Sequence, residues 1–452
     1  MVDVPKFTTP PPIGGNFTVA HLDDAWLAEA SDYQTDIMSG APVGQSKQTG
    51  TLDNIVRLFD DRYDTLARIM RQECGFVESH QIGYVKRHKH EFTGWNAECN
   101  LIVMVSDLGT TKKGNKRLTV EDPSGEMTIF APQKNPMCAS LLRDDVIGVT
   151  GSFLKDTDIF WVKRIQYPEV LMSHQNRGGE DYDPVSIAFA SDLHMGSIEF
   201  MEPEWDKMMA WLNSGHPIAK NIKYFVFTGD VVEGVGVYPG QEKNLGPNSE
   251  HHHTYSTDMM NVYDQYEFFA RKLDMLPDHI NPIIIPGNHD AVRPAEPQPV
   301  LEERIQNMFN DATFIGNPMR AQLSGIDVLA YHGKGVDDMV PVMKHVTYEA
   351  PAEAMKEMLK KRHLAPIWGE RNALSPEEED QMVIRDVPDV FVTGHTHAHQ
   401  VEWFRGLPLI VSSTFQNETD FMNMLGYKAK KCLLTVYNIR NRETKVIPFG
   451  DA

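Results

Sequence analysis

Five short blocks of potential metal ligands occupy the C-terminal part of this chain, each at the end of an apolar segment. They read Ser191-Asp192-Leu193-His194, Gly229-Asp230, Gly287-Asn288-His289-Asp290, Tyr331-His332-Gly333 and Gly394-His395-Thr396-His397. The apolar segments before them, such as 224–228 and 282–286, have the composition of buried strands. Polar side chains at the carboxyl ends of buried strands are typical of the site of an α/β sheet. The pattern therefore predicts an α/β sheet that gathers these side chains in one place.

The blocks supply three Asp, one Asn and five His side chains. Carboxylate and amide oxygens together with imidazole nitrogens suit Mn²⁺, Fe or Zn²⁺ better than Ca²⁺. Asp192 and His194 are two residues apart, so both side chains point the same way on an extended segment, and His395 and His397 repeat this spacing. Two cations about 3.5–4 Å apart can hold a phosphate and activate a water molecule. The blocks therefore indicate a two-metal hydrolase.

Each block alone has an ordinary interpretation. A single Asp-x-His is mostly chance, and Gly-Asp after a strand is most often a turn. A single His332 is more often a hydrogen-bonded core or surface histidine. The joint occurrence of the blocks, in order and each after a strand, is what favours a metal site.

In this order the blocks resemble the calcineurin-like metallophosphoesterase superfamily, whose pattern is D-x-H, G-D, G-N-H-D/E, H and G-H-x-H. The resemblance implies three ligands for each metal and one shared ligand. The first metal would be held by Asp192, His194 and His397, the second by Asn288, His332 and His395, and Asp230 would bridge them. His289 would donate a proton to the leaving alkoxide or stabilise the developing charge, with Asp290 orienting it.

Residues 80–170 resemble an oligonucleotide-binding (OB) barrel, because five short apolar strands alternate there with Gly-rich turns. An OB barrel followed by a phosphoesterase resembles the small subunits of archaeal family-D DNA polymerases. It is also the layout of the eukaryotic B-subunits, whose metal ligands are eroded, whereas none is missing here. The resemblance implies a 3′–5′ DNA exonuclease that proofreads in a heterodimer with a large catalytic subunit. Its substrate would be single-stranded or primer-end DNA, and its metals Mn²⁺ first, with Fe or Zn²⁺ as alternatives.

Two other functions remain open. The chain could be a non-catalytic scaffold that holds the large polymerase chain, with vestigial metals. It could also be a phosphodiesterase for small substrates, although the barrel speaks against this. The complete ligand set speaks against the scaffold.

The expected fold is an α/β metallophosphoesterase sandwich, with two mixed sheets flanked by helices, preceded by an all-β OB barrel. We expect a disordered Pro- and Gly-rich leader at 1–50, an amphipathic helix at 51–75, the barrel at 80–170, a linker at 171–184 and the phosphodiesterase domain at 185–452. Expected barrel strands are Leu101–Val105, Arg117–Val120, Met127–Phe130, Val146–Val149 and Phe160–Val162. Expected helices of the last domain are Glu204–Leu212, Asp258–Leu276, Val300–Phe309 and Ala352–Arg362, and its late strands are Leu409–Ser412, Cys432–Tyr437 and Thr444–Pro448.

The charge balance limits how this chain can hold DNA. It has 43 basic and 63 acidic residues, a net charge of −20, which does not favour gripping nucleic acid with the whole surface. Basic candidates are few: Lys112, Lys113, Lys116 and Arg117 of the first barrel hairpin, and Arg293 close to the third block. The alternative for the four hairpin residues is a solvated hairpin tip, and the alternative for Arg293 is a surface ion pair.

The sequence has no signal-peptide core, no apolar run long enough to cross a membrane, and four scattered cysteines. We therefore expect a cytoplasmic protein without membrane contact.

Overall fold

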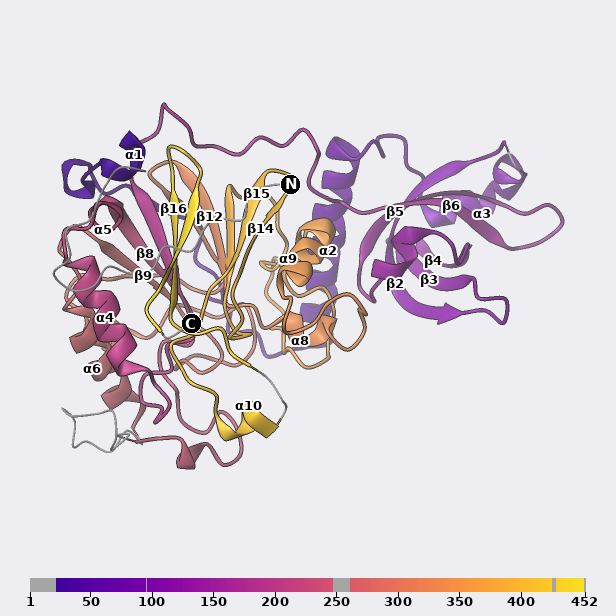
Figure 1. Ribbon diagram of the computed structural model, residues 1–452. Helices are drawn as coiled ribbons and strands as arrows, with labels where there is room; N and C mark the ends of the chain where they lie inside the picture. Colours follow the sequence, from indigo (N-terminus) through magenta and orange to yellow (C-terminus); the bar gives the residue numbers. More distant parts are fainter. Residues whose placement is uncertain (1–21, 95, 247–260, 425–427, 451–452) are drawn as a thin grey trace.

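The computed structural model describes residues 22–94, 96–246, 261–424 and 428–450. Figure 1 shows a sandwich of two sheets, a long helix beside it and a separate barrel on the far side of that helix. The sandwich carries all five ligand blocks. Among the described residues, no helix has the length and apolar character needed to cross a bilayer.

The first sheet of the sandwich has six strands in the order β10-β9-β8-β7-β16-β17. These strands are β7 (Ser186–Ala190), β8 (Ile222–Thr228), β9 (Asn281–Ile285), β10 (Thr313–Phe314), β16 (Leu433–Asn438) and β17 (Thr444–Pro448). The strands β7 to β10 are parallel, and β16 pairs antiparallel with both β7 and β17. Because β7, β8 and β9 run in the same direction, the loops that follow them emerge at one edge.

The second sheet also has six strands, in the order β1-β11-β12-β13-β15-β14. They are β1 (Ile37–Ser39), β11 (Met319–Leu323), β12 (Ile326–Tyr331), β13 (Val390–Thr393), β14 (Gln400–Phe404) and β15 (Leu407–Val411). Here β12, β13 and β15 are parallel and the other pairs antiparallel, so both sheets are mixed, as expected. Fully buried side chains such as Phe189 and Val226 from the first sheet pack against Val328 and Val392 from the second.

Helices cover the outer faces of the two sheets. The helices α4 (Glu202–Leu212), α5 (Pro217–Asn221), α6 (Val262–Leu273) and α7 (Glu303–Gln306) belong to the first sheet, and α8 (Val336–Met339) and α9 (Ala352–Lys361) to the second. The predicted helices at α4 and α9 are confirmed. The prediction for α6 included 258–260, which lie outside the described residues. The prediction of a helix from Val300 to Phe309 was too long, because after Gln306 the N–H groups of Met308 and Phe309 bond three residues back and tighten the chain into turns.

The predicted amphipathic helix is α2 (Leu52–Glu73), and it packs between the barrel and the sandwich. Its first turn is capped by the Thr51 hydroxyl, which accepts the N–H of Asn54. The Tyr63 hydroxyl donates to the carbonyl of Ile102 in the barrel at 2.9 Å. The Arg62 guanidinium donates to the Asp380 carboxylate of the sandwich domain at 2.7 Å. The helix therefore ties the two domains together.

The second domain is a closed five-stranded barrel in the order β2-β3-β4-β6-β5. Its strands, β2 (Cys99–Thr110), β3 (Lys116–Asp122), β4 (Gly125–Ala131), β5 (Val146–Phe153) and β6 (Phe160–Gln166), contain all five predicted segments. One expectation was wrong: the region from residue 80 is not all β, since α3 (Ile82–Arg87) and the 3₁₀ turns η2 (Lys89–Phe92) and η3 (Pro136–Ser140) belong to it. Ile82 and Val85, three residues apart, are both buried in the barrel core, which explains why this segment is helical.

The expectation of a disordered leader is wrong for residues 22–50, whereas residues 1–21 lie outside the described part. This segment forms α1 (Asp24–Leu27), the 3₁₀ turn η1 (Ala30–Asp32) and the edge strand β1. Trp26 has no exposed surface, and its indole N–H donates to Glu443 at 3.1 Å. A large aromatic side chain buried in this way outweighs a composition rich in Pro and Gly. Residues 171–184, predicted as a linker, form no helix or strand and cross from the barrel to β7.

Candidate metal centre

The five ligand blocks meet at one edge of the sandwich, because each follows the carboxyl end of a parallel strand. Asp192 and His194 follow β7, Asp230 follows β8, and Asn288 with His289 follows β9. From the second sheet, His332 follows β12, and His395 and His397 follow β13. The edge where the two sheets meet therefore collects all the side chains that the sequence predicted as ligands.

Five of these residues have a left-handed backbone, which is unfavourable for a residue with a side chain. The φ angles are 51° at Asp192, 51° at His194, 50° at Asp230, 67° at His395 and 50° at His397. Backbone strain of this kind costs about 1–3 kcal/mol per residue and persists where the surroundings impose it, commonly at functional sites. The shared conformation turns each side chain inward from the end of its strand.

Two glycines leave the space that these side chains occupy. A Cβ at Gly287 would lie 2.2 Å from Asp230 Oδ1, and a Cβ at Gly394 would lie 2.6 Å from Asp192 Oδ2. Both contacts are shorter than any real Cβ contact. The glycines in the third and fifth blocks are therefore required by the carboxylates beside them.

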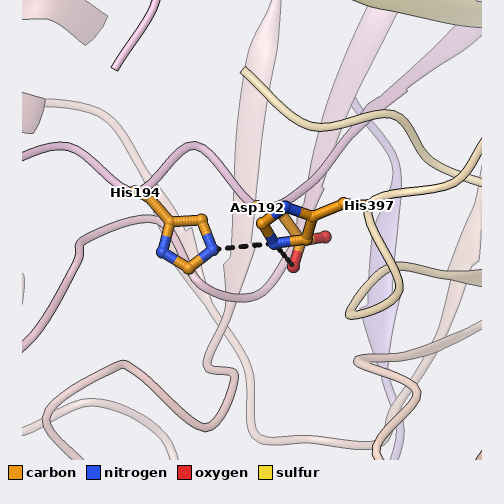
Figure 2. Close-up of side chains that lie close together, drawn as sticks. All are labelled: Asp192, His194 and His397. Carbon is orange, nitrogen blue, oxygen red and sulfur yellow. Dashed lines mark hydrogen bonds and ion pairs between the residues drawn. The ribbon is translucent and has the colours of Figure 1, made fainter. Parts of the chain in front are cut away.

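The first group of ligands consists of Asp192, His194 and His397, whose ligand atoms all lie within 4.8 Å of one another. Figure 2 shows the two imidazole rings and the carboxylate directed at a common point. His194 Nε2 lies 3.1 Å from His397 Nε2, which lies 3.6 Å from Asp192 Oδ1. The Asp192 carboxylate also accepts the backbone N–H of His395 at 2.9 Å, which fixes its orientation.

The second group consists of Asp230, Asn288, His332 and His395. His332 Nε2 lies 3.3 Å from Asp230 Oδ2 and 3.1 Å from Asn288 Oδ1. The ligand atoms of Asp230, His332 and His395 lie within 4.8 Å of one another. His332 Nδ1 donates to the carbonyl of Thr228 at 2.9 Å, so its Nε2 presents a lone pair to two oxygens. Three such electron-rich atoms facing one another need a proton or a cation between them.

Asp230 lies between the two groups. Its Oδ2 atom is 3.3 Å from His332 Nε2 in the second group and 3.9 Å from His194 Nε2 in the first. Its Oδ1 atom accepts the backbone N–H of His289 at 2.7 Å. One carboxylate therefore faces both groups, which is the position expected of a shared ligand.

Two carboxylates that the sequence did not single out hold the outer nitrogens of ligand histidines. Glu233 Oε2 accepts from His194 Nδ1 at 2.9 Å, and Asp337 Oδ2 accepts from His395 Nε2 at 3.1 Å. Such partners fix the ring orientation of a metal-ligating histidine and raise its basicity. Glu233 lies three residues after Asp230, and Asp337 lies five after His332. Their proximity to the blocks was the only available signal.

Without a cation, the negative charge of the site is balanced by protons on imidazole. Burial alone would lower the pKa of His194, but the Glu233 carboxylate outweighs it and raises that pKa to about 9. In the same way, burial opposes and Asp230 raises the pKa of His332, to about 10. Buried histidines with raised pKa values show that the surroundings favour positive charge.

The residues fit a pair of divalent cations. Cation–nitrogen and cation–oxygen bonds of about 2.0–2.2 Å place neighbouring ligand atoms roughly 3.0–3.5 Å apart, and the 3.1 and 3.3 Å separations agree with this. The mixed O/N donor set suits Mn²⁺, Fe or Zn²⁺. His397 directs its Nε2 atom at the first group, 3.1 Å from His194 Nε2 and 3.6 Å from Asp192 Oδ1, which is the atom that a cation there would bind.

His289 lies at the site, but Asp290 does not orient it as predicted. His289 Nδ1 donates to the backbone carbonyl of Glu233 at 2.7 Å, which leaves Nε2 facing Asp230 Oδ2 at 4.0 Å. The Asp290 carboxylate instead accepts from the Tyr266 hydroxyl and the Gly287 N–H, both at 2.8 Å. Burial and the nearby Asp230 charge raise the pKa of Asp290 to about 7. Its role is to shape the turn that carries Asn288 and His289.

The predicted contact of Arg293 with substrate is not supported. Its guanidinium donates to Glu377 at 2.6 Å and to the carbonyls of Ser46 and Pro297. These internal bonds use the group to fasten residues 40–50 to the sandwich.

The basic hairpin of the barrel is exposed at Lys112, Lys113 and Arg117, and half-buried at Lys116. Arg117 pairs with Asp107 at 3.1 Å.

Two lysines that the sequence did not single out lie close to ligands. Lys334 is half-buried two residues after His332, and Lys430 is exposed, with its backbone N–H donating to the His397 carbonyl at 2.8 Å. Burial alone would raise the pKa of Asp337, but His395 outweighs it and, together with the charge of Lys334, lowers that pKa to about 2. Within the described residues, neither ammonium group has an ion-pair partner. Both ammonium groups are therefore available to bind an anion beside the ligand groups.

Comparison with known proteins gives consistent matches. Residues 187–402 match the family model that describes the B-subunit of DNA polymerases alpha and epsilon. The DNA polymerase II small subunit of Archaeoglobus fulgidus is 36% identical over 87% of this chain and 77% of its own length. That of Methanocaldococcus jannaschii is 35% identical over 92% of this chain and 68% of its own. A solved structure described as a novel archaeal phosphodiesterase aligns over 58% of this chain and 99% of its own, with 14% identity and a TM-score of 0.28.

Proposed function

Because this chain belongs to the family of archaeal DNA polymerase II small subunits, we propose that it is a two-metal-dependent 3′–5′ exonuclease that proofreads for a large catalytic subunit. The observation that carries this proposal is the complete ligand set. Every predicted ligand lies at one edge of the sandwich, and the inner atoms of His194, Asp230 and His332 face a common space. A scaffold with vestigial metals would not need five strained residues there.

The ligands divide between two cation positions. Asp192, His194 and His397 would hold one cation, Asn288, His332 and His395 the other, and Asp230 would bridge them. When bound, two divalent cations, Mn²⁺ first with Fe or Zn²⁺ as alternatives, supply polarisation of the phosphate and a lowered pKa of the attacking water. The chain's own residues fix the geometry, because each outer imidazole nitrogen has an acceptor. The acceptor is the Glu233 carboxylate for His194, the Thr228 carbonyl for His332 and the Asp337 carboxylate for His395.

His289 is placed to serve the leaving group. Its Nδ1 is tied to the Glu233 carbonyl, so its Nε2 is the atom that can exchange a proton at the site. An alkoxide from a phosphodiester is a poor leaving group. A proton delivered to it as it departs raises the rate by about 10²–10⁴-fold. His289 would therefore protonate the departing oxygen.

The DNA would be held by local positive charge. Lys334 and Lys430 lie beside the two ligand groups and can bind the phosphates on either side of the cleaved one. The barrel would be an OB fold, with Lys112, Lys113, Lys116 and Arg117 on its first hairpin contacting the strand further away. A chain of net charge −20 needs such local groups or a basic partner, which fits a subunit of a heterodimer.

One experiment separates this proposal from its two alternatives. The chain, alone and with the large subunit, is incubated with Mn²⁺ and 5′-labelled single-stranded DNA, para-nitrophenyl phosphate or bis-para-nitrophenyl phosphate. A ladder of DNA shortened from the 3′ end, absent in Asp230→Ala, is the expected result. Diester hydrolysis without DNA degradation would point to a small-substrate enzyme. Inertness in both preparations would point to a scaffold.

A further inference from the structure

Two of the proposed ligand histidines depend on a buried or half-buried carboxylate outside the ligand blocks. Glu233 is 1% exposed, and its Oε2 lies 2.9 Å from His194 Nδ1. Asp337 at the start of α8 is half-buried, and its Oδ2 lies 3.1 Å from His395 Nε2. His194 and His395 belong to different ligand groups. The two carboxylates therefore act on different halves of the site.

We infer that Glu233 and Asp337 are positioning residues, each of which sets the affinity of one cation position by fixing the tautomer and orientation of its histidine. This inference rests on the proposed metal site. An acceptor at the outer nitrogen holds the proton there and leaves a lone pair on the inner nitrogen, where a ligand needs it. For His194 the inner nitrogen is Nε2, which faces His397 and Asp230. For His395 it is Nδ1.

The surroundings of Glu233 show that this carboxylate is held in place. Its Oε1 atom accepts from the Tyr238 hydroxyl at 2.9 Å and from Gln241 Nε2 at 3.1 Å. Its Oε2 atom accepts from Gln416 Nε2 at 3.0 Å in addition to His194. Four donors converge on the two oxygens, so the acceptor that His194 meets has a fixed position.

Asp337 is arranged in the same way with fewer partners. Its Oδ1 atom accepts from the Tyr348 hydroxyl at 3.0 Å, while Oδ2 accepts from His395. Each carboxylate thus has one oxygen for a ligand histidine and a tyrosine hydroxyl on the other. This parallel offers matched controls, because a Tyr→Phe change removes one hydrogen bond from the same carboxylate but leaves the histidine contact.

The alternative is that both carboxylates only stabilise the fold. In that case Glu233→Gln and Tyr238→Phe, or Asp337→Asn and Tyr348→Phe, would have similar effects, and none would act on one cation position alone. A positioning role predicts a different pattern. An amide cannot accept from every donor that the carboxylate binds, so the histidine is released from its tautomer, whereas the Phe variants keep the acceptor.

The test is calorimetric titration of the full chain with Mn²⁺, with thermal unfolding as a check on folding. We expect two binding steps for the wild type. Glu233→Gln should weaken one step by about 10–100-fold and Asp337→Asn the other by a similar factor. The double variant should weaken both, and Tyr238→Phe and Tyr348→Phe should leave both within about threefold. If Glu233→Gln does not fold, Asp337→Asn with its own control decides alone.

The outcomes separate this inference from the proposed function. Two steps of wild-type affinity in a folded Glu233→Gln and a folded Asp337→Asn would overturn the inference while leaving the metal site intact. Equal weakening by the carboxylate and tyrosine variants would also overturn it. A wild-type chain that binds no Mn²⁺ would overturn the proposed function, and the inference with it.

Discussion

The Nε2 atoms of His194 and His397 lie 3.1 Å apart, although 203 positions separate the two residues in the chain. His194 Nδ1 is bonded to Glu233, so its Nε2 has a lone pair that points at another imidazole nitrogen. Two nitrogens that face each other in this largely buried position need a proton or a cation between them. This relationship is one physical basis for proposing a metal site at the sandwich edge.

Asp230→Asn should abolish the binding of both cations while the fold persists. The substitution keeps the shape of the side chain but removes the charge that faces His194 and His332. We expect the affinity for Mn²⁺ in calorimetric titration to fall by more than about 100-fold, since removing a direct ligand should exceed the loss from its supporting residues. Asp158→Asn, at a barrel carboxylate that is 98% exposed, serves as the control. Two tight sites in Asp230→Asn would disprove the shared-ligand role.

His289→Ala should retain both cations and lose turnover in a way that depends on the leaving group. Para-nitrophenolate leaves without a proton, whereas the alkoxide of DNA needs one. We expect DNA cleavage to fall by about 10²–10⁴-fold and hydrolysis of bis-para-nitrophenyl phosphate to fall far less. The measurement compares the cleavage rates of the two substrates at saturating Mn²⁺. An equal loss on both would assign His289 to binding or folding instead of proton transfer.

Lys334→Gln and Lys430→Gln should weaken DNA binding without changing the cations. Each lysine that neutralises a phosphate contributes close to one unit to the slope of log affinity against log salt concentration. We expect each variant to raise KM for DNA and lower that slope by about 0.7–0.9, with unchanged hydrolysis of bis-para-nitrophenyl phosphate. Fluorescence anisotropy at several salt concentrations measures the slope. Lys155→Gln, at an exposed barrel lysine, is the control, and a slope equal to the wild type in both site variants would reject this DNA path.

The sequence predicted most of the sandwich and every proposed metal ligand, because both depend on local patterns. An apolar strand followed by Gly and Asp, as at Asp230, is visible in a few residues. Glu233 and Asp337 were not predicted, because nothing in their neighbours shows which imidazole a carboxylate will meet after folding. Asp290 was misassigned for the same reason: its partner Tyr266 comes from a different element.

Two other errors arose from contacts that no local pattern encodes. Arg293 lies three residues after Asp290, but its guanidinium bonds to Glu377, 84 positions away. Residues 22–50 have the composition of a disordered tail, yet Trp26 finds a buried place on the first sheet and β1 pairs with β11. In both cases long-range packing determined the structure.

Asp380→Asn should destabilise the junction between α2 and the sandwich domain. The Arg62–Asp380 pair has side-chain exposures of 1% and 2%, and removing one partner of a buried pair costs about 3–5 kcal/mol. The free energy of unfolding in urea should fall by about that amount. The matched control is Asp107→Asn, which breaks the exposed Arg117–Asp107 pair and should cost less than about 1 kcal/mol. Similar losses in both variants would contradict the role given to burial.

The same pair predicts how stability changes in acid. Burial alone would raise the pKa of Asp380, but the charges of Arg62 and His363 outweigh it and hold that pKa well below its usual range. A carboxyl group with a depressed folded pKa adds stability above its unfolded pKa, near about 3.9, and that stability is lost as the pH falls toward the folded value. The wild type should therefore lose more free energy of unfolding than Asp380→Asn between about pH 5 and about pH 3. Parallel curves would contradict this.

Anomalous diffraction from crystals soaked in Mn²⁺ tests the central claim most directly, because it locates cations without relying on activity. We expect two peaks about 3.5–4 Å apart, one within bonding distance of Asp192, His194 and His397 and the other of Asn288, His332 and His395, with Asp230 touching both. Absence of any peak at this edge of the sandwich, in crystals where Mn²⁺ is bound elsewhere, would contradict the assignment of a two-metal centre.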